Sequence, residues 1–246
     1  MNSLRQRDAP PCSQSLNLDN VPTGWYAYFM RLQPVERSPP GGARNKLLDA
    51  ALLIIREKGY AATSVDELCA EAGVTKGAFF HHFKSKGALG VAAAHHWSEI
   101  TGAFFETAPY HKHSDPLERV LGYLDFRKAI LKGEIAEFTC LVGTMVQEIY
   151  DTNPDIREAC EASISTHAAK VESDIADAIK FYRIRAPWTA EGLALHMQAV
   201  LQGAFILAKA KGNAAVVEAS IDHLRRYVEL LFCRPKKKAS RENRKN

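Results

Sequence analysis

The sequence predicts an all-α fold in which a small three-helix unit precedes a larger helical body. Between residues 44 and 232, apolar side chains recur at three- and four-residue spacing, and no segment shows the alternation typical of a β-strand. Polar residues such as Ser64, Thr75 and Asp115 mark where helices begin. A glycine turn at Gly73 joins the second and third helices, as in a helix-turn-helix.

The first predicted helix ends at Gly59, which is a C-cap candidate. Either Thr63 or Ser64 caps the second helix, because an acidic residue lies three positions after each of them. Glu67 gives Ser64 a capping box. The second helix is expected to extend to about Ala72.

The third helix has one apolar side and one side free for contact. Gly73 supplies the turn before it, because glycine tolerates a left-handed backbone. Phe79 and Phe83 lie four residues apart and are expected to pack against the first two helices. The other side then carries Lys76, Gly77, Ala78, Phe80 and His82. In a helix-turn-helix, the N-terminal residues of this second helix of the motif enter the major groove of DNA.

The run AGVTKGAFFHHFKSKGAL, residues 72–89, resembles the DNA-binding domain of the TetR/AcrR family of bacterial transcriptional regulators, and the resemblance covers residues 44–89. The chain departs from the family pattern at three positions. Phe80 stands where tyrosine is usual, Cys69 where alanine is commoner, and Gly87 where an acidic residue is frequent. Loss of the tyrosine hydroxyl removes a phosphate contact but leaves an apolar contact with a thymine methyl group.

The resemblance implies where the DNA contacts lie. Residues in the places of Lys76–Ala78 approach base edges, and those in the places of Phe80 and His82 contact phosphates or thymine methyl groups. Lys86 and the hydroxyl groups at the start of the second helix meet phosphates, because helix starts attract anions. The predicted DNA-binding residues are Thr63, Ser64, Thr75, Lys76, Gly77, Ala78, Phe80, His81, His82, Lys84 and Lys86.

The body is expected to contain six helices. They cover about residues 85–107, 116–132, 136–150, 154–181 and 189–211, and a last one ends at Phe232. Within the third of these, Gly143 is expected to admit a close helix or ligand, because glycine inside a helix is about 1 kcal/mol less favourable than alanine.

The last two helices carry broader apolar faces than one packing side needs, which predicts a partner surface. In the TetR/AcrR family, these two helices pack against their copies in a second subunit as a four-helix bundle. A dimer also suits DNA recognition, since two heads would meet successive major grooves about 34–36 Å apart. The expected partners are therefore a second copy of the chain and a palindromic double-stranded DNA operator.

The resemblance also implies a small-molecule effector, because family members commonly release DNA when a ligand enters a cavity among the middle helices. Candidate ligand-binding residues are Phe104, Tyr123, Phe126, Cys140, Met145, His167 and Met197. Ordinary core packing is the alternative role for each of them. Their aromatic and methionine character would suit an apolar or amphipathic effector. Cys140 resembles the cysteine with which a subset of the family senses electrophiles or oxidants, and a structural role is its alternative.

Four parts are predicted along the chain. A disordered, proline-rich leader covers residues 1–43, and Met30 within it is an alternative translation start. The helix-turn-helix DNA-binding domain covers 44–90, and the effector-binding and dimerisation domain covers 91–233. A basic disordered tail covers 234–246, as a solvated end or as a source of non-specific DNA affinity.

Composition agrees with a soluble, cytoplasmic protein. The chain has 246 residues, of which 46% are hydrophobic and 24% are charged. It has no apolar run of about 20 residues and no signal-peptide pattern, so no membrane association is expected. The net charge of +4 hides an asymmetry, because the head and tail are basic whereas the body is acidic. Contact with nucleic acid is therefore expected at one end of the fold.

Other classes of function are less well supported by the sequence. No nucleophile–base pair, phosphate-binding loop or metal-ligand set argues for an enzyme. The five cysteines lack metal-ligand spacing, and the histidines lack the helical pairing with a carboxylate that zinc sites show. The sequence therefore predicts no disulfide, no metal site and no cofactor. A DNA-binding regulator whose body senses a partner protein remains an alternative to a ligand-responsive one.

Overall fold

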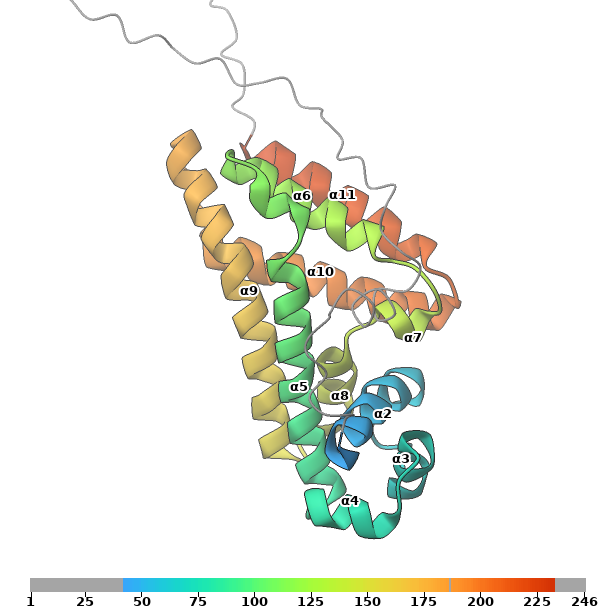
Figure 1. The fold of residues 1–246 in the computed structure, drawn as a ribbon. Helices are drawn as coiled ribbons and strands as arrows, with labels where there is room; N and C mark the ends of the chain where they lie inside the picture. The colour runs from blue at the N-terminus through green and yellow to red at the C-terminus, as the bar shows by residue number, and fades with distance from the viewer. Residues whose placement is uncertain (1–41, 186, 233–246) are drawn as a thin grey trace, which may run out of the picture.

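The computed structural model describes residues 42–185 and 187–232, and every regular element in these ranges is a helix (Figure 1). In chain order they are α2 (Ala43–Lys58), α3 (Val65–Ala72), α4 (Lys76–His82), α5 (Lys86–Glu106), the 3-10 helix η1 (Pro109–Lys112), α6 (Pro116–Ala129), α7 (Ile135–Phe138), α8 (Leu141–Ile149), α9 (Pro154–Tyr182), α10 (Ala190–Lys211) and α11 (Ala215–Phe232). The all-α prediction is confirmed. The predicted tail, and the predicted leader up to residue 41, lie outside the described residues.

Helices α2, α3 and α4 form the head, residues 43–82. Ser64 is the N-cap of α3, and its side chain and that of Glu67 make the predicted capping box. Gly73 ends α3 in the left-handed conformation, with φ of 61° and ψ of 39°. The hydroxyl of Thr75 accepts a hydrogen bond from the amide of Ala78 and so caps α4. Local capping and turn chemistry therefore set the limits of the recognition helix.

Aromatic packing decides which side of α4 faces outward. Phe79 and Phe83 are buried, and their ring centroids are 5.9 Å apart on the side of α4 that packs against α2 and α3. Phe80, the residue directly after Phe79, is 56% exposed. The spacing of the phenylalanines thus presents the predicted contact side of α4 to solvent.

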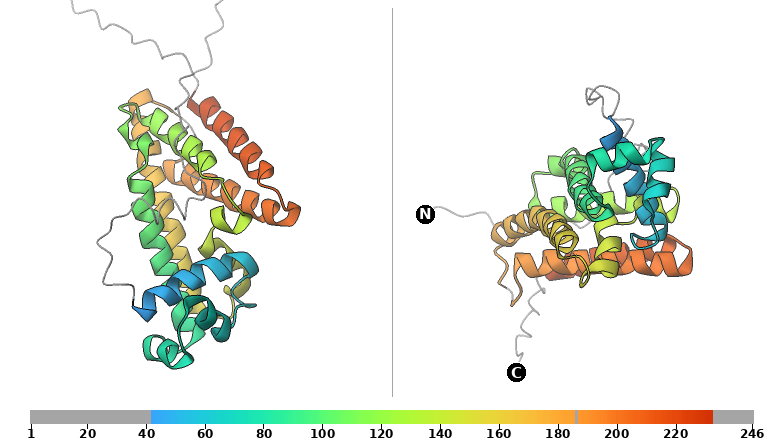
Figure 2. Two further views of the ribbon diagram at one scale, coloured as in Figure 1. Left: turned by 45° about the vertical axis from the view of Figure 1, so that its right-hand side comes forward. Right: turned by 90° about the horizontal axis from the view of Figure 1, so that it is seen from below.

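The body is built around two long neighbouring helices, α5 and α9 (Figure 1). Helix α5 starts directly after the head and runs into the body beside α9. Helices α6 and α10 pack against α9, and α11 packs against α6 and α10. The head therefore lies at one end of the molecule, and α11 lies toward the other (Figure 2). Buried residues of head and body form one continuous cluster, so the two parts share a core.

The expected single helix over 136–150 is wrong, because the chain breaks into α7 and α8. Thr139 between them is extended, with φ of −84° and ψ of 161°, and Cys140 is the N-cap of α8. The sulfur of Cys140 accepts a hydrogen bond from the amide of Gly143, and its carbonyl accepts one from the hydroxyl of Thr144. These local bonds satisfy backbone groups at a new helix start, which periodicity alone did not reveal.

Gly143 lies in the first turn of α8, where the end of a side chain from α10 occupies the space beside it. A Cβ atom there would lie 2.1 Å from the side-chain oxygen of Gln202 on α10.

Helix α6 ends earlier than expected, at Ala129 rather than residue 132. Gly133 follows with a φ of 81°, which favours glycine and starts the turn into α7.

Helix α10 is long and apolar enough to cross a bilayer by length and composition alone. Buried residues on one of its sides, among them Met197 and Leu201, pack in the shared core instead. Core helices of soluble proteins commonly have this composition.

Candidate DNA-binding surface and effector cavity

The outward side of α4 carries most of the predicted DNA contacts. Along α4 and just after it, the exposed residues are Lys76, Gly77, Phe80, His81, His82 and Lys84, and Ala78 is half-buried. Thr75, at the start of α4, is exposed, but its hydroxyl is used in the cap. The structure thus brings together, on one face, the residues that the sequence singled out, while DNA contact by them stays a prediction.

Lys76 already has an anionic partner. Its ammonium group lies 2.7 Å from the carboxylate of Asp66 on α3, and both side chains are exposed. The hydrogen bond to Asp66 raises the pKa of Lys76 above its ordinary value. Lys76 is therefore positively charged at neutral pH, and contact with DNA would require it to leave Asp66.

The hydroxyl groups at the start of α3 are less available than the sequence implied. Thr63 is only 2% exposed, and its hydroxyl donates to the carbonyl of Gly59, so a direct phosphate contact by its side chain does not fit the structure. The hydroxyl of Ser64 is bonded to the carboxylate of Glu67. A hydrogen bond from Lys58 holds the pKa of Glu67 down at about 2, so this carboxylate is ionised.

Lys86 has a structural role that the sequence did not suggest. Its ammonium group donates to the carbonyl oxygens of Tyr60, Ala61 and Thr63, at 2.9, 3.3 and 2.7 Å. It also lies 4.4 Å from the centre of the Tyr60 ring. Lys86 therefore ties the start of α5 to the loop between α2 and α3, and any phosphate contact would be made beside these bonds.

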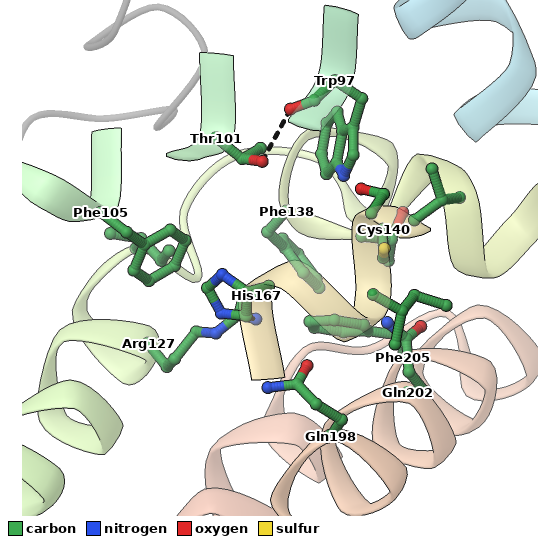
Figure 3. A pocket seen from close by; sticks show the side chains of 15 residues that line it. Trp97, Thr101, Phe105, Arg127, Phe138, Cys140, His167, Gln198, Gln202 and Phe205 are labelled. Carbon is green, nitrogen blue, oxygen red and sulfur yellow. Dashed lines mark hydrogen bonds between the residues drawn. The ribbon is translucent and has the colours of Figure 1, made fainter. Parts of the chain in front are cut away.

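A cavity lies in the body between α5, α6, α8, α9 and α10 (Figure 3). Its open volume is about 50 Å³. Its walls are mostly apolar and aromatic, with a few polar groups, and are made by Trp97, Thr101, Phe105, Arg127, Ile130, Phe138, Thr139, Cys140, Val142, Ser163, Ile164, His167, Gln198, Gln202 and Phe205.

Only part of the predicted ligand-binding set lines this cavity. Cys140 and His167 do. The other five predicted residues are buried in the core instead, namely Phe104, Tyr123, Phe126, Met145 and Met197. Periodicity identified them as inward-facing but could not separate the packed interior from a cavity wall. The polar wall residues Arg127, Thr139 and Gln198 were missed. The i, i+4 pair of Tyr123 and Arg127 on an apolar helix was the signal that could have revealed one of them.

The polar wall is a connected network around the hydroxyl of Tyr123. That oxygen accepts hydrogen bonds from Arg127 at 3.0 Å and from Gln198 at 3.2 Å, and lies 3.0 Å from Nε2 of His167. Burial lowers the pKa of His167 to about 3, with a further contribution from Arg127. The imidazole is therefore neutral, and Nε2 accepts because Arg127, at 3.4 Å from it, can only donate.

The wall of the cavity is linked to the head by Arg56, at the end of α2. Arg56 is 1% exposed and donates to the carbonyls of Leu52 and Glu137, at 2.6 and 3.0 Å. Its guanidinium lies 5.3 Å from the ring centre of Trp97, a cavity residue. Lys209 of α10 donates to the carbonyl of Arg56. A displacement at the cavity can thus reach the head through direct contacts.

A second cavity, of about 330 Å³, lies at the boundary of head and body. The end of α2, one side of α8 and the C-terminal half of α10 line it, and it shares Thr139 and Cys140 with the first cavity. Within the described ranges no group of three or more potential metal ligands is found.

Comparison with known proteins identifies the family. Residues 47–93 match the model of bacterial regulatory proteins of the tetR family, and residues 116–224 match a tetracyclin repressor-like C-terminal domain. The chain belongs to the TetR family. It is a helix-turn-helix transcriptional regulator that binds DNA, as the head predicts.

Relatives and solved structures agree with this assignment. The chain is 29% identical over 129 residues to the transposon Tn10 TetC protein of Escherichia coli and 26% identical over 167 residues to the transcriptional regulator AcuR of Cereibacter sphaeroides. These matches cover 42% and 68% of this chain and 66% and 76% of the relatives. A TetR regulatory protein from Rhodobacter sphaeroides has the same fold, with a TM-score of 0.68 and 23% identity over 76% of this chain and 99% of that one.

The buried neutral His167 predicts a pH dependence of stability. Its pKa is about 3 in the folded protein and about 6.5 when unfolded. The unfolded state therefore binds the extra proton, and stability falls as pH drops from 6.5 toward 3. Between pH 7 and 5 we expect the protein to lose about 2 kcal/mol more than the His167→Gln variant, by urea unfolding. Equal losses would contradict the assignment, and exposed His95→Gln serves as the control.

Proposed function

We propose that this TetR-family protein is a cytoplasmic, ligand-responsive repressor that binds a palindromic operator as a homodimer. The exposed face of α4, on a capped and packed helix-turn-helix head, is the observation that carries this proposal. Lys76, Gly77 and Ala78 are assigned to base edges, because they lie at the front of the recognition helix. Phe80 offers an exposed apolar surface for a thymine methyl group. The activity is regulation and not catalysis.

The proposed dimer forms through α10 and α11. Both helices keep large apolar side chains at the surface, with Leu195, Ile206 and Leu207 on α10 and Tyr227 and Leu230 on α11 each 45–71% exposed. The rings of His196 and Tyr227 are in contact, with centroids 5.4 Å apart, so the two helices present one continuous face. An exposed apolar face of this kind supports a self-complementary contact that places two heads on one operator.

Effector binding is proposed to act through α5. Trp97, Thr101 and Phe105 of this helix line the first cavity, and the same helix begins at the end of the head, where Lys86 anchors it. A ligand that fits better when α5 is shifted would favour one position of the head over the other. The contact of Arg56 with Trp97 gives a second route between the cavity and the head.

A response to thiol-reactive compounds is a second candidate, because Cys140 lines both cavities and is half-buried at the start of α8. Cys160 is a weaker candidate, because burial raises the pKa of its thiol to about 12. A regulator that senses a partner protein would show neither a ligand response nor a thiol response.

The assignment of the recognition helix is tested by Lys76→Ala. Loss of a base contact is expected to reduce the preference for operator over scrambled DNA by about 1–3 kcal/mol, with little change in binding to the scrambled duplex. Fluorescence anisotropy with palindromes that flank the protein's own gene measures both affinities. Lys112→Ala, an exposed lysine of the body, is the matched control. An unchanged preference would show that Lys76 reads no base.

The proposed dimer face is tested by a charge at its centre. Leu207→Glu would place carboxylates against each other in an apolar interface, and light scattering is expected to show a monomer with weakened operator binding. Tyr150→Glu provides a control, because Tyr150 is 62% exposed but lies at the end of α8, away from this face. A Leu207→Glu protein that stays dimeric would place the interface elsewhere.

The thiol candidate is tested by alkylation of the native protein. If it is correct, iodoacetamide modifies Cys140 before Cys160, operator binding falls, and Cys140→Ser removes the effect. Mass spectrometry of the modified protein identifies the site, and anisotropy measures DNA binding. Modification of Cys140 without loss of DNA binding would exclude this mechanism.

A further inference from the structure

Among the described residues, the wall of the first cavity has a single ionised side chain, and that side chain is a cation. Arg127 lies in the wall, whereas no aspartate or glutamate is among the residues that line it. The neighbouring His167 is neutral because burial lowers its pKa. The cavity therefore has a positive electrostatic potential, which disfavours cationic ligands and favours an anion.

Arg127 has polar and aromatic neighbours but no anionic one. Its guanidinium donates to Tyr123 and His167 and lies 4.7 Å from the ring centre of Phe105. Across the described ranges, no carboxylate lies within ion-pair distance of it, although other arginines of the body, such as Arg119 and Arg225, are paired with aspartates. Half-buried arginines usually pair with an anion, because desolvation of the charge is otherwise uncompensated. A ligand carboxylate would supply that anion.

A second observation points to the same cavity. The hydroxyl oxygen of Thr139 is the one buried side-chain polar atom in the described part of the chain without a hydrogen-bond partner. Thr139 is 1% exposed and lines the cavity next to Cys140, at the start of α8. A buried hydroxyl without a partner is destabilising, and a ligand oxygen would supply the missing hydrogen bond.

The two features are on different sides of the cavity. Arg127 belongs to α6 and lies beside His167 and Phe105 in Figure 3, whereas Thr139 belongs to the break between α7 and α8. One ligand oxygen is therefore not placed to meet both residues. A ligand with a carboxylate at one end and a further oxygen toward the other would satisfy each.

The size of the cavity limits the ligand to a short chain. Its open volume of about 50 Å³ is well below the roughly 150 Å³ of a cavity that holds benzene. Apolar walls from Phe138, Val142 and Phe205 would cover the few carbon atoms between the two polar ends. Even a hydroxy acid of four carbon atoms is about the size of benzene, so its entry would push α5, α8 and α10 slightly apart, which is the kind of movement proposed for an effector.

The geometry points to a short-chain carboxylate with a hydroxyl or keto oxygen as the effector, its carboxylate bound by Arg127 and its second oxygen by Thr139. This inference rests on the proposed ligand-responsive function and specifies the chemistry of that site. It assigns Arg127 and Thr139, which the sequence did not single out, as the residues that determine ligand class.

Calorimetry on the DNA-free protein tests this with three probes of nearly equal size: 3-hydroxybutyrate, butyrate and 3-hydroxybutyramide. The hydroxy acid is expected to bind tightest, and the uncharged amide at least about tenfold more weakly, because it loses a charge-assisted bond. Equal binding of acid and amide, or binding of neither acid, would overturn the inference.

Three variants separate the two contacts. Arg127→Gln is expected to remove the preference for the acid over the amide, and Arg127→Lys, which retains the charge, is expected to keep most of it. Thr139→Val is expected to lower affinity for 3-hydroxybutyrate several-fold and to leave butyrate unchanged. The Thr139→Val protein should fold at least as well as the parent, because the hydroxyl that it removes makes no hydrogen bond. Loss of binding to both acids in Thr139→Val would contradict the assigned role.

Operator binding distinguishes failure of this inference from failure of the proposed function. If a neutral or cationic compound releases the operator and carboxylates do not, the protein is a ligand-responsive regulator with a different effector class. If the flanking palindromes are not bound at all, the proposed function itself is wrong. Release by 3-hydroxybutyrate that Arg127→Gln abolishes would support both.

Discussion

The packing of α2, the first helix of the head, against the body is the constraint on which the rest of the structure depends. One side of α2 holds α3 and α4, and other parts of it contact α5, α7 and α8. Arg56 lies in this boundary, almost fully buried, with its guanidinium bonded to carbonyls of α2 and α7. A buried arginine needs all such partners, because an unsatisfied charge in the interior is costly. The head is thereby held in one orientation, and a change in α7 or α5 would alter it.

Because the chain breaks between α7 and α8, the first cavity lies next to the boundary between head and body. In an unbroken helix, the backbone amides and carbonyls would bond to one another, and only side chains would face the cavity. The break instead places Thr139 and Cys140 in the walls of both cavities, and puts the carbonyl of Glu137 within reach of Arg56. A few residues of irregular backbone therefore connect a ligand-sized space to the DNA-binding head. Such a short connection suits a bistable regulator, in which small shifts must reach a distant surface.

Charge is distributed in agreement with these roles. The head combines exposed cations with carboxylates that hold them in the free protein, as Asp66 holds Lys76. Contact with DNA would exchange that partner for a phosphate or base, so the net gain from Lys76 alone would be modest. At the first cavity the reverse holds, since Arg127 has no carboxylate partner among the described residues and His167 is neutral. A charge without an anionic partner is tolerated where a ligand can supply one.

The sequence by itself determined the helical class, the caps and turn of the recognition helix and the outward side of α4. These follow from local rules: the capping box of Ser64 and Glu67, the left-handed Gly73, and the four-residue spacing of Phe79 and Phe83. Only the tertiary structure decided that Thr63 is buried, that Lys86 ties down a loop, and which inward-facing residues line a cavity. Those outcomes depend on contacts between residues far apart in the chain, such as Arg127 and His167. Periodicity reports which side of a helix faces inward, but the fit of neighbouring helices determines whether that side meets packed atoms or open space.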